Sequence, residues 1–154
     1  MTNQQSVHVL LAEDDPDDRL LVKRAFQTAM PQSSISMVSD GEELLEYLNR
    51  EGKFSDPVEC PRPSLIILDL NMPRKDGHQV LRELKSRPEL RHIPVVVLTT
   101  SVSERDVTLC YQLGVNAFIS KPPSFTKLKK MVRALTDFWF DVVKLPPGGA
   151  LTSF

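Results

Sequence analysis

Residues 65–73 read LIILDLNMP, in which four large apolar residues lead directly to an acidic one, Asp69. The apolar run is too short for a surface helix and carries no polar alternation, so it predicts a buried strand. A carboxylate at the end of such a strand is costly to bury unless a partner offsets its charge. The stretch therefore predicts a strand in the core and a polar site at the carboxyl end of that strand.

The same order, an apolar run followed by a helical pattern, recurs five times along the 154 residues. The runs that predict strands are 7–12, 33–39, 65–68, 93–98 and 117–119. Helical spacing predicts helices from Pro16 toward Pro31, over 42–50, from Gly77 toward Pro88, over 103–113 and after Ser124. The stretch 52–63, rich in proline and polar residues, is interpreted as an extended loop. Alternating strands and helices predict a doubly wound α/β fold with a parallel sheet.

Polar residues follow four of the predicted strands. They are Glu13 with Asp14, Asp69, Thr99 with Thr100, and Lys121. In open parallel sheets the site lies beyond the carboxyl ends of the strands, so we expect these groups to meet at one edge. By contrast, Asp15, Asp17 and Asp18 are interpreted as serving a helix N-terminus, and no chemistry is assigned to them.

The chemistry of this set predicts a phosphoryl acceptor. Three acids near one point repel each other unless a cation is present, and Mg²⁺ prefers carboxylate, carbonyl and water oxygens. Next to such an ion, Asp69 can stay ionised and attack phosphorus. Lys121 supplies a positive charge, and Thr99 supplies a hydroxyl, for the oxygens of the incoming group.

In combination, these motifs resemble the receiver domain of two-component response regulators, from Val7 to about Val143. The resemblance implies a flavodoxin-like five-stranded sheet in the order 2-1-3-4-5, with Asp69 as the phosphorylated residue. It implies that Asp14, Asp69 and the backbone carbonyl of Asn71 hold Mg²⁺, with Glu13 acting through water. The amides of Asn71 and Thr100 would contact the phosphoryl group.

The same resemblance assigns a switch. Thr99 would move toward the phosphoryl group, and Phe118 falls at the family's switch-aromatic position, where it brings no hydroxyl. Asn71 and Ser101, which flank the acceptor in the family pattern, would tune the lifetime of the phosphoryl group. The peptide between Lys121 and Pro122 is usually cis in this family.

A narrower resemblance is to the single-domain regulators that partner bacterial phytochromes. It rests on the insert before 65–68, on PRPSLIILDLNMPRKDG (61–77) and on DFWFDVVKLP (137–146). It implies a phytochrome-type sensor histidine kinase as partner and a homodimer. The residues alone also favour a dimer, because Phe138, Trp139 and Phe140 are consecutive and cannot all face one sheet. The expected domain is 1–144, followed by a flexible tail, 145–154.

Composition excludes several other classes of protein. The formal net charge of -1 gives no field for nucleic acid, and we expect the cations Lys127, Lys129, Lys130 and Arg133 to form a solvated helix face. We expect no membrane segment and no leader peptide. The two cysteines, Cys60 and Cys110, form no metal-ligand spacing or disulfide framework, so a cytoplasmic protein is expected.

Two other classes of protein compete with a phosphorylated signalling protein. An aspartate-nucleophile phosphatase of the haloacid dehalogenase type is rejected, because it needs a second Asp where this chain has Asn71. A receiver-like module that binds partners without phosphorylation remains open. In either signalling case the chain is expected not to be an enzyme that turns over a free substrate.

Overall fold

Five strands and five α-helices alternate along the chain in the computed structural model, which describes residues 7–31, 33–100, 103–142 and 144. The strands are β1 (His8–Ala12), β2 (Ser34–Val38), β3 (Leu65–Leu68), β4 (Val95–Thr99) and β5 (Ala117–Ser120). The helices are α1 (Pro16–Ala29), α2 (Gly41–Asn49), α3 (Gly77–Ser86), α4 (Glu104–Gln112) and α5 (Phe125–Thr136).

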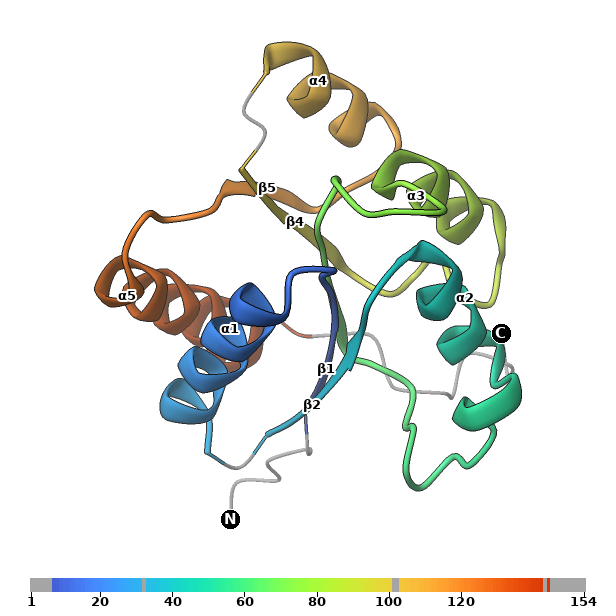
Figure 1. Ribbon diagram of the computed structural model, residues 1–154, viewed down its shortest axis with the longest axis horizontal. Helices are drawn as coiled ribbons and strands as arrows, with labels where there is room; N and C mark the ends of the chain where they lie inside the picture. Colours follow the sequence, from blue (N-terminus) through green and yellow to red (C-terminus); the bar gives the residue numbers. More distant parts are fainter. Residues whose placement is uncertain (1–6, 32, 101–102, 143, 145–154) are drawn as a thin grey trace.

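The strands form one parallel sheet in the order β2-β1-β3-β4-β5 (Figure 1). Pairing is in register through the centre, with Leu10 opposite Ile66 and Ile66 opposite Val95. The predicted doubly wound fold and its strand order are therefore confirmed. None of the helices in the described part of the chain combines the length and the apolar character needed to cross a membrane.

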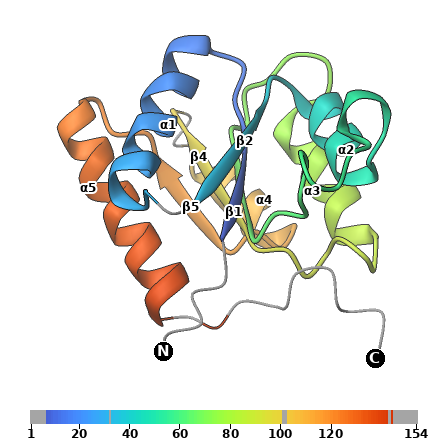
Figure 2. The same ribbon diagram turned by 90° about the horizontal axis from the view of Figure 1, so that it is seen from below.

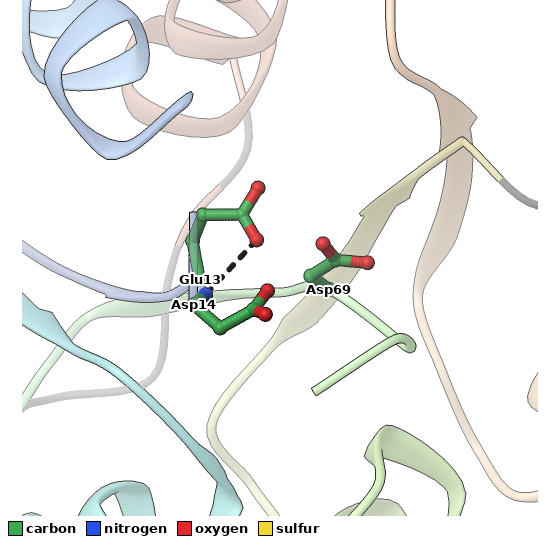
Figure 3. Close-up of side chains that lie close together, drawn as sticks. All are labelled: Glu13, Asp14 and Asp69. Carbon is green, nitrogen blue, oxygen red and sulfur yellow. Dashed lines mark hydrogen bonds between the residues drawn. The ribbon is translucent and has the colours of Figure 1, made fainter. Parts of the chain in front are cut away.

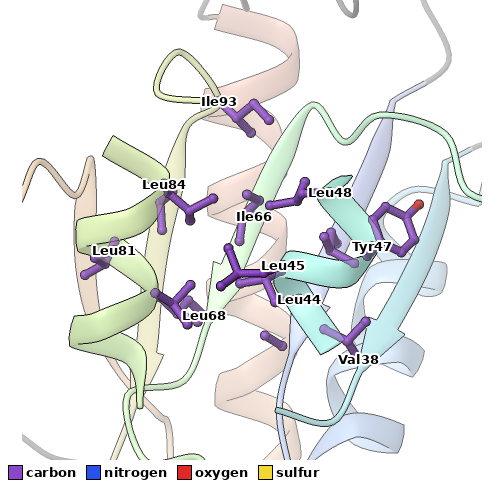
Figure 4. Packing of buried hydrophobic residues seen from close by; sticks show 14 of the residues in the cluster. Val38, Leu44, Leu45, Tyr47, Leu48, Ile66, Leu68, Leu81, Leu84 and Ile93 are labelled. Atoms are coloured by element: carbon purple, nitrogen blue, oxygen red, sulfur yellow. The ribbon is translucent and has the colours of Figure 1, made fainter. Parts of the chain in front are cut away.

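Successive residues of the central strands face opposite sides of the sheet. On β1, Val9 belongs to the core beneath α1 and α5, whereas Leu10 belongs to the core beneath α2, α3 and α4. Figure 2 shows α1 and α5 on one side of the sheet and α2 and α3 on the other, and Figure 4 shows the α2–α3 side. Because both faces are covered, β1, β3 and β4 are buried along their whole length.

Capping residues in the local sequence mark where the helices begin and where α4 ends. Their N-caps are Asp15, Asp40, Asp76, Ser103 and Ser124, each accepting a hydrogen bond from a backbone N–H of the first turn. At the other end of α4, Gly114 adopts φ +100°, a conformation that favours glycine. These signals agree with the helix N-terminus predicted at Asp15, the end of the helix predicted over 103–113 and the helix predicted after Ser124.

Two segments differ from the sequence prediction. The stretch 52–63 is not extended throughout: Gly52–Phe54 form a 3-10 turn, because the apolar Phe54 ring is buried against Tyr47, 5.4 Å between ring centroids. After α5, Asp137–Val142 wind as a π-helix rather than continuing the α-helix. The predicted tail, 145–154, lies outside the described residues.

Candidate functional site

Four strand ends bring polar residues to one edge of the sheet. Glu13 and Asp14 follow β1, Asp69 follows β3, Thr99 ends β4, and Lys121 follows β5. One carboxylate oxygen from each of Glu13, Asp14 and Asp69 lies within 4.8 Å of the other two (Figure 3). The structure thus brings together the residues that the sequence placed at strand ends.

Backbone hydrogen bonds place the two buried acids of this edge. The amide of Asp69 donates to the carbonyl of Ala12 at 3.0 Å, and the amide of Glu13 donates to the carbonyl of Val38 at 3.1 Å. Each bond continues the sheet one residue beyond its strand. Glu13 is 1% exposed and Asp69 is 6% exposed, so both carboxylates lie where water compensates little of their charge.

A glycine lets α3 begin close to this edge. A Cβ atom at Gly77 would lie 2.8 Å from the Cα of Leu70 and 3.1 Å from the carbonyl oxygen of Asp69. Any larger residue would therefore push the start of α3 away from the end of β3.

The ammonium of Lys121 is the positive centre of the site. Its Nζ donates a short hydrogen bond to Glu13 Oε1, and it lies 3.0 Å from both Asp69 Oδ2 and Asp18 Oδ2. The backbone N–H of Lys121 donates to the carbonyl of Thr99 at 2.9 Å, which places the residue directly after β5. One ammonium thus contacts three carboxylates.

The charges in this cluster shift one another's pKa. Burial raises the pKa of Glu13 to about 8, and its contact with Asp69 adds to the rise while Lys121 opposes it. Burial also acts to raise the pKa of Asp69, but contacts with Glu13, the Asn71 amide and Lys121 outweigh it and lower the pKa. Burial lowers the pKa of Lys121, yet hydrogen bonds to Glu13, Asp18 and Asp69 raise it overall.

The donor set fits a hard divalent cation. Glu13, Asp14 and Asp69 offer only oxygen ligands, and Asp14 is exposed, so water can complete the coordination of an ion there. The amide of Asp14 donates to Glu13 Oε2 at 3.1 Å, the contact drawn in Figure 3, which orients the Glu13 carboxylate beside Asp14. The excess of carboxylates over ammonium groups makes a further cation favourable.

Asp18 is the site residue that sequence reasoning missed. It was interpreted as part of a helix N-terminus, yet its carboxylate contacts Lys121 Nζ. The helical spacing could have indicated this contact. Asp18 lies three and four residues before Leu21 and Val22, and it therefore shares the side of the helix that packs on the sheet. Asp17 has no such contact among the described side chains.

Thr99 and Asn71 lie next to the acids. Thr99 is fully buried, and the Asn71 side-chain nitrogen is 3.5 Å from its hydroxyl oxygen. The backbone N–H of Asn71 donates to Asp69 Oδ1 at 3.1 Å. The roles of the Asn71 carbonyl and the Thr100 amide stay predictions, and Ser101 lies outside the described residues.

Phe118, the expected switch aromatic, is half-buried on β5. Its side chain packs against the core beneath α2, α3 and α4, and its backbone N–H donates to the hydroxyl of Tyr111 on α4 at 3.2 Å. A tyrosine hydroxyl therefore lies near this position, although it comes from another element. The peptide bond between Lys121 and Pro122 is trans, as are the other described peptide bonds.

The three aromatic residues after α5 do not behave alike. Trp139 and Phe140 are half-buried and pack against the core beneath α1 and α5. Phe138 is 53% exposed and rests edge-on against Trp139, 5.8 Å between ring centroids. The expectation that they cannot all face the sheet is confirmed, and Phe138 is the one left on the surface.

Comparisons with known proteins agree with this architecture. Residues 9–133 match the family model described as the response regulator receiver domain. The chain is 41% identical over 138 residues to the response regulator Rcp1 of Synechocystis sp., covering 90% of this chain and 92% of that protein.

Two solved structures extend the comparison. A crystal structure of the phosphorylated cyanobacterial phytochrome response regulator RcpA superimposes with a TM-score of 0.86 at 39% identity, covering 92% of this chain and 99% of RcpA. The Mn²⁺-bound form of Rcp1 superimposes with a TM-score of 0.82 at 41% identity, covering 91% of this chain and 99% of Rcp1.

Proposed function

This chain belongs to the response regulator receiver domain family, and on that premise we propose that Asp69 accepts a phosphoryl group from a sensor histidine kinase in a Mg²⁺-dependent reaction. One observation carries the proposal. A buried carboxylate with a lowered pKa touches the ammonium of Lys121 and shares its strand edge with the acids Glu13 and Asp14. A nucleophile, a cation and a metal-ligand set are thereby within reach of one phosphoryl group.

Asp14, Asp69 and the backbone carbonyl of Asn71 would hold Mg²⁺, with Glu13 acting through water. When bound, the ion supplies positive charge to the oxygens of the group being transferred. Such an ion would add its positive charge to that of Lys121, which already lowers the pKa of Asp69, so Asp69 stays ionised at neutral pH. The similarity to Rcp1, whose Mn²⁺-bound form is known, supports a divalent metal at this site.

The transfer itself is a displacement at phosphorus. An oxygen of the Asp69 carboxylate forms the new O–P bond, the P–N bond to the donor's phosphohistidine breaks, and its electron pair returns to the imidazole. Lys121 leaves its carboxylate partners to pair with the phosphoryl oxygens, while the Thr99 hydroxyl and the backbone amides of Asn71 and Thr100 donate to them. Water later cleaves the acyl phosphate, so the protein acts on its own Asp69 rather than on a free substrate.

The signal is proposed to leave the site through the side of the sheet nearest β5. Movement of Thr99 toward the phosphoryl group would leave space behind it for Phe118 to move inward. Since the Phe118 backbone is hydrogen-bonded to Tyr111, such a movement also reaches α4. The surface formed by α4, β5 and α5 would then change its contacts with partner proteins.

A phytochrome-type histidine kinase is the proposed donor, and a homodimer is the proposed assembly. The similarity to RcpA, a phytochrome response regulator, supports the first. The exposed ring of Phe138 supports the second, because exposed aromatic side chains are enriched in protein interfaces. A cytoplasmic location, as expected from the sequence, accords with both.

Intact mass after incubation with acetyl phosphate and Mg²⁺ tests the acceptor. We expect the parent and Asp17→Asn to gain one phosphoryl group and Asp69→Asn to gain none. Omission of Mg²⁺ should abolish the gain. A folded parent that gains nothing with Mg²⁺ would favour the receiver-like module that binds partners without phosphorylation.

Sedimentation velocity tests the dimer. Phe138→Ser should shift the protein toward monomer, whereas Val58→Ser should not, although Val58 is 85% exposed. An unchanged dimer in Phe138→Ser would place the interface elsewhere.

A further inference from the structure

Asp18 differs from the other two acids that contact the Lys121 ammonium. Glu13 and Asp69 also belong to the cluster whose oxygens can hold a metal ion, and Asp18 does not. Its Oδ2 lies 3.0 Å from Lys121 Nζ, the same distance as that of Asp69 Oδ2. Asp18 is therefore the one of these three partners of Lys121 that lies outside the acid cluster.

Metal binding would alter the contacts of Lys121. A divalent cation held by Asp14 and Asp69, with Glu13 acting through water, draws on two carboxylates that face the ammonium, and the two cations repel each other. With the metal bound, the contacts of Lys121 with Glu13 and Asp69 weaken together. The Lys121 side chain is only 13% exposed, so its ammonium cannot lose carboxylate partners without a cost in free energy. The contact with the remaining carboxylate, Asp18, then matters more.

The position of Asp18 suits this role. It lies in the first turn of α1, which is anchored on the sheet by the buried side chains of Val22 and Phe26. Asp18 and Lys121 both line a hollow of about 120 Å³ between α1 and the segment that leads into α5. Lys121 can thus swing away from the metal while staying in contact with Asp18.

We propose that Asp18 is a positioning residue that holds the Lys121 ammonium beside the acid cluster when a divalent cation binds there. The inference rests on the proposed function, because it concerns the same site. In the metal-free protein three carboxylates share Lys121, and in the metal-bound protein Asp18 alone retains it. Lys121 is thereby kept one side-chain movement away from an arriving phosphoryl group.

Mg²⁺ affinity measured by titration calorimetry tests the proposal without a phosphoryl donor. A double-mutant cycle uses the parent, Asp18→Asn, Lys121→Met and the double variant at fixed ionic strength, with folding checked by circular dichroism. We expect Asp18→Asn to weaken Mg²⁺ binding about fivefold in the parent and less than about twofold in the Lys121→Met background. Asp17→Asn removes the same charge one residue away and should change affinity less than about twofold.

The outcomes separate this inference from the proposed function. Equal losses from Asp18→Asn in both backgrounds would mean that Asp18 acts by charge alone, and the positioning role would be overturned while the metal site stood. No Mg²⁺ binding by the folded parent would overturn both the metal site and the positioning role.

A spectroscopic readout follows Lys121 directly. In ¹⁵N-lysine-labelled protein, we expect the Lys121 ammonium signal to persist on addition of Mg²⁺ in the parent and to exchange away in Asp18→Asn. Loss of the signal in the Mg²⁺-bound parent would contradict the retention of Lys121 by Asp18.

Discussion

Both ends of strand β1 bury a polar side chain, and the two ends satisfy it in different ways. His8, the first residue of the strand, is 6% exposed, and Glu13, just past its end, is 1% exposed. Around His8 every partner is a neutral hydrogen-bonding group. Around Glu13 the partners are charged, and carboxylates outnumber the ammonium.

The amino end is a closed network. His8 Nδ1 lies 2.5 Å from Ser34 Oγ, and Nε2 lies 2.9 Å from the Tyr47 hydroxyl, which donates to the carbonyl of Pro61 at 2.8 Å. This order assigns the His8 proton to Nε2, because the Tyr47 hydroxyl then accepts from His8 and donates onward. Such a network ties β1 to β2, α2 and the segment before β3, and it needs no further ligand.

The carboxyl end is an open network, since its charges balance fully only when another cation arrives. Burial of a polar group does not by itself mark a functional site. A buried group whose hydrogen bonds are complete stabilises the fold. A buried group with surplus charge of one sign marks a place where a ligand binds.

The largest expected loss of unfolding free energy comes from a substitution at the carboxyl end of β1. Lys121→Met removes the ammonium from Glu13 and Asp69, and we expect it to cost about 3 kcal/mol of unfolding free energy in EDTA. Mg²⁺ should narrow the gap to the parent, because the ion supplies the missing positive charge. Urea unfolding with EDTA and with Mg²⁺ measures both values. If the parent and Lys121→Met differ in unfolding free energy by the same amount in EDTA and in Mg²⁺, the ion does not compensate the surplus negative charge of the carboxylates.

The next effect is at the closed end and depends on pH. Burial lowers the pKa of His8 to about 4, whereas an unfolded histidine titrates near 6.5. The network's contribution is thus complete above about pH 6.5 and is lost as the pH falls toward 4, because the unfolded state binds the proton first. Between pH 7 and pH 5 we expect a loss of about 2 kcal/mol through His8.

Urea unfolding at pH 7 and pH 5 measures this loss, with His8→Gln as the control for the carboxylates that also titrate. The pH dependence should be shallower in His8→Gln than in the parent. Parallel curves for the two proteins would show that His8 is not the group responsible.

Removal of the Tyr47 hydroxyl, at the amino end of β1, is expected to cost less unfolding free energy. Tyr47→Phe removes the hydroxyl between His8 and the Pro61 carbonyl and leaves both without that partner, which should cost about 1 to 2 kcal/mol. Mg²⁺ affinity should not change, because the hydroxyl lies at the opposite end of β1 from the acids. Thermal unfolding and calorimetry on the same variant decide whether the two ends are independent.

The smallest loss of unfolding free energy is expected from a substitution of Ser34, the exposed hydrogen-bonding partner of His8. Ser34 is exposed, so water can replace its hydroxyl beside His8 Nδ1 in Ser34→Ala. The loss in unfolding free energy should stay within about 0.5 kcal/mol. A loss as large as that of Tyr47→Phe would show that water does not reach His8.

Much of the fold could be predicted because its signals are local. The LIIL run before Asp69, the N-cap Asp15 and the stop at Gly114 each depend on a few neighbouring residues. The loop predicted over 52–63 is present, but a turn at Gly52–Phe54 interrupts it, because the apolar Phe54 ring packs against Tyr47. Its turn depends on a contact partner that composition does not reveal.

The sequence predicts which residues belong to the candidate site better than it predicts which of them touch. Acids and a lysine at the ends of parallel strands must meet at one edge, so Glu13, Asp14, Asp69 and Lys121 could be grouped without coordinates. Asp18 could not be grouped with them by this rule, because it lies in a helix and not at a strand end. The Tyr111 hydroxyl beside Phe118 was missed for the same reason.

Strand and cap signals act over a few residues, so the local sequence specifies which residues end the strands and which chemical groups lie at the sheet edge. How the charges of these groups are shared depends on the tertiary fold. Lys121 meets Asp18 across 103 residues of sequence, and Glu13 becomes one of the most buried side chains of the protein. Both outcomes depend on where α1 packs against the sheet, since the strength of a charge pair is set by the burial and geometry of partners that folding brings together.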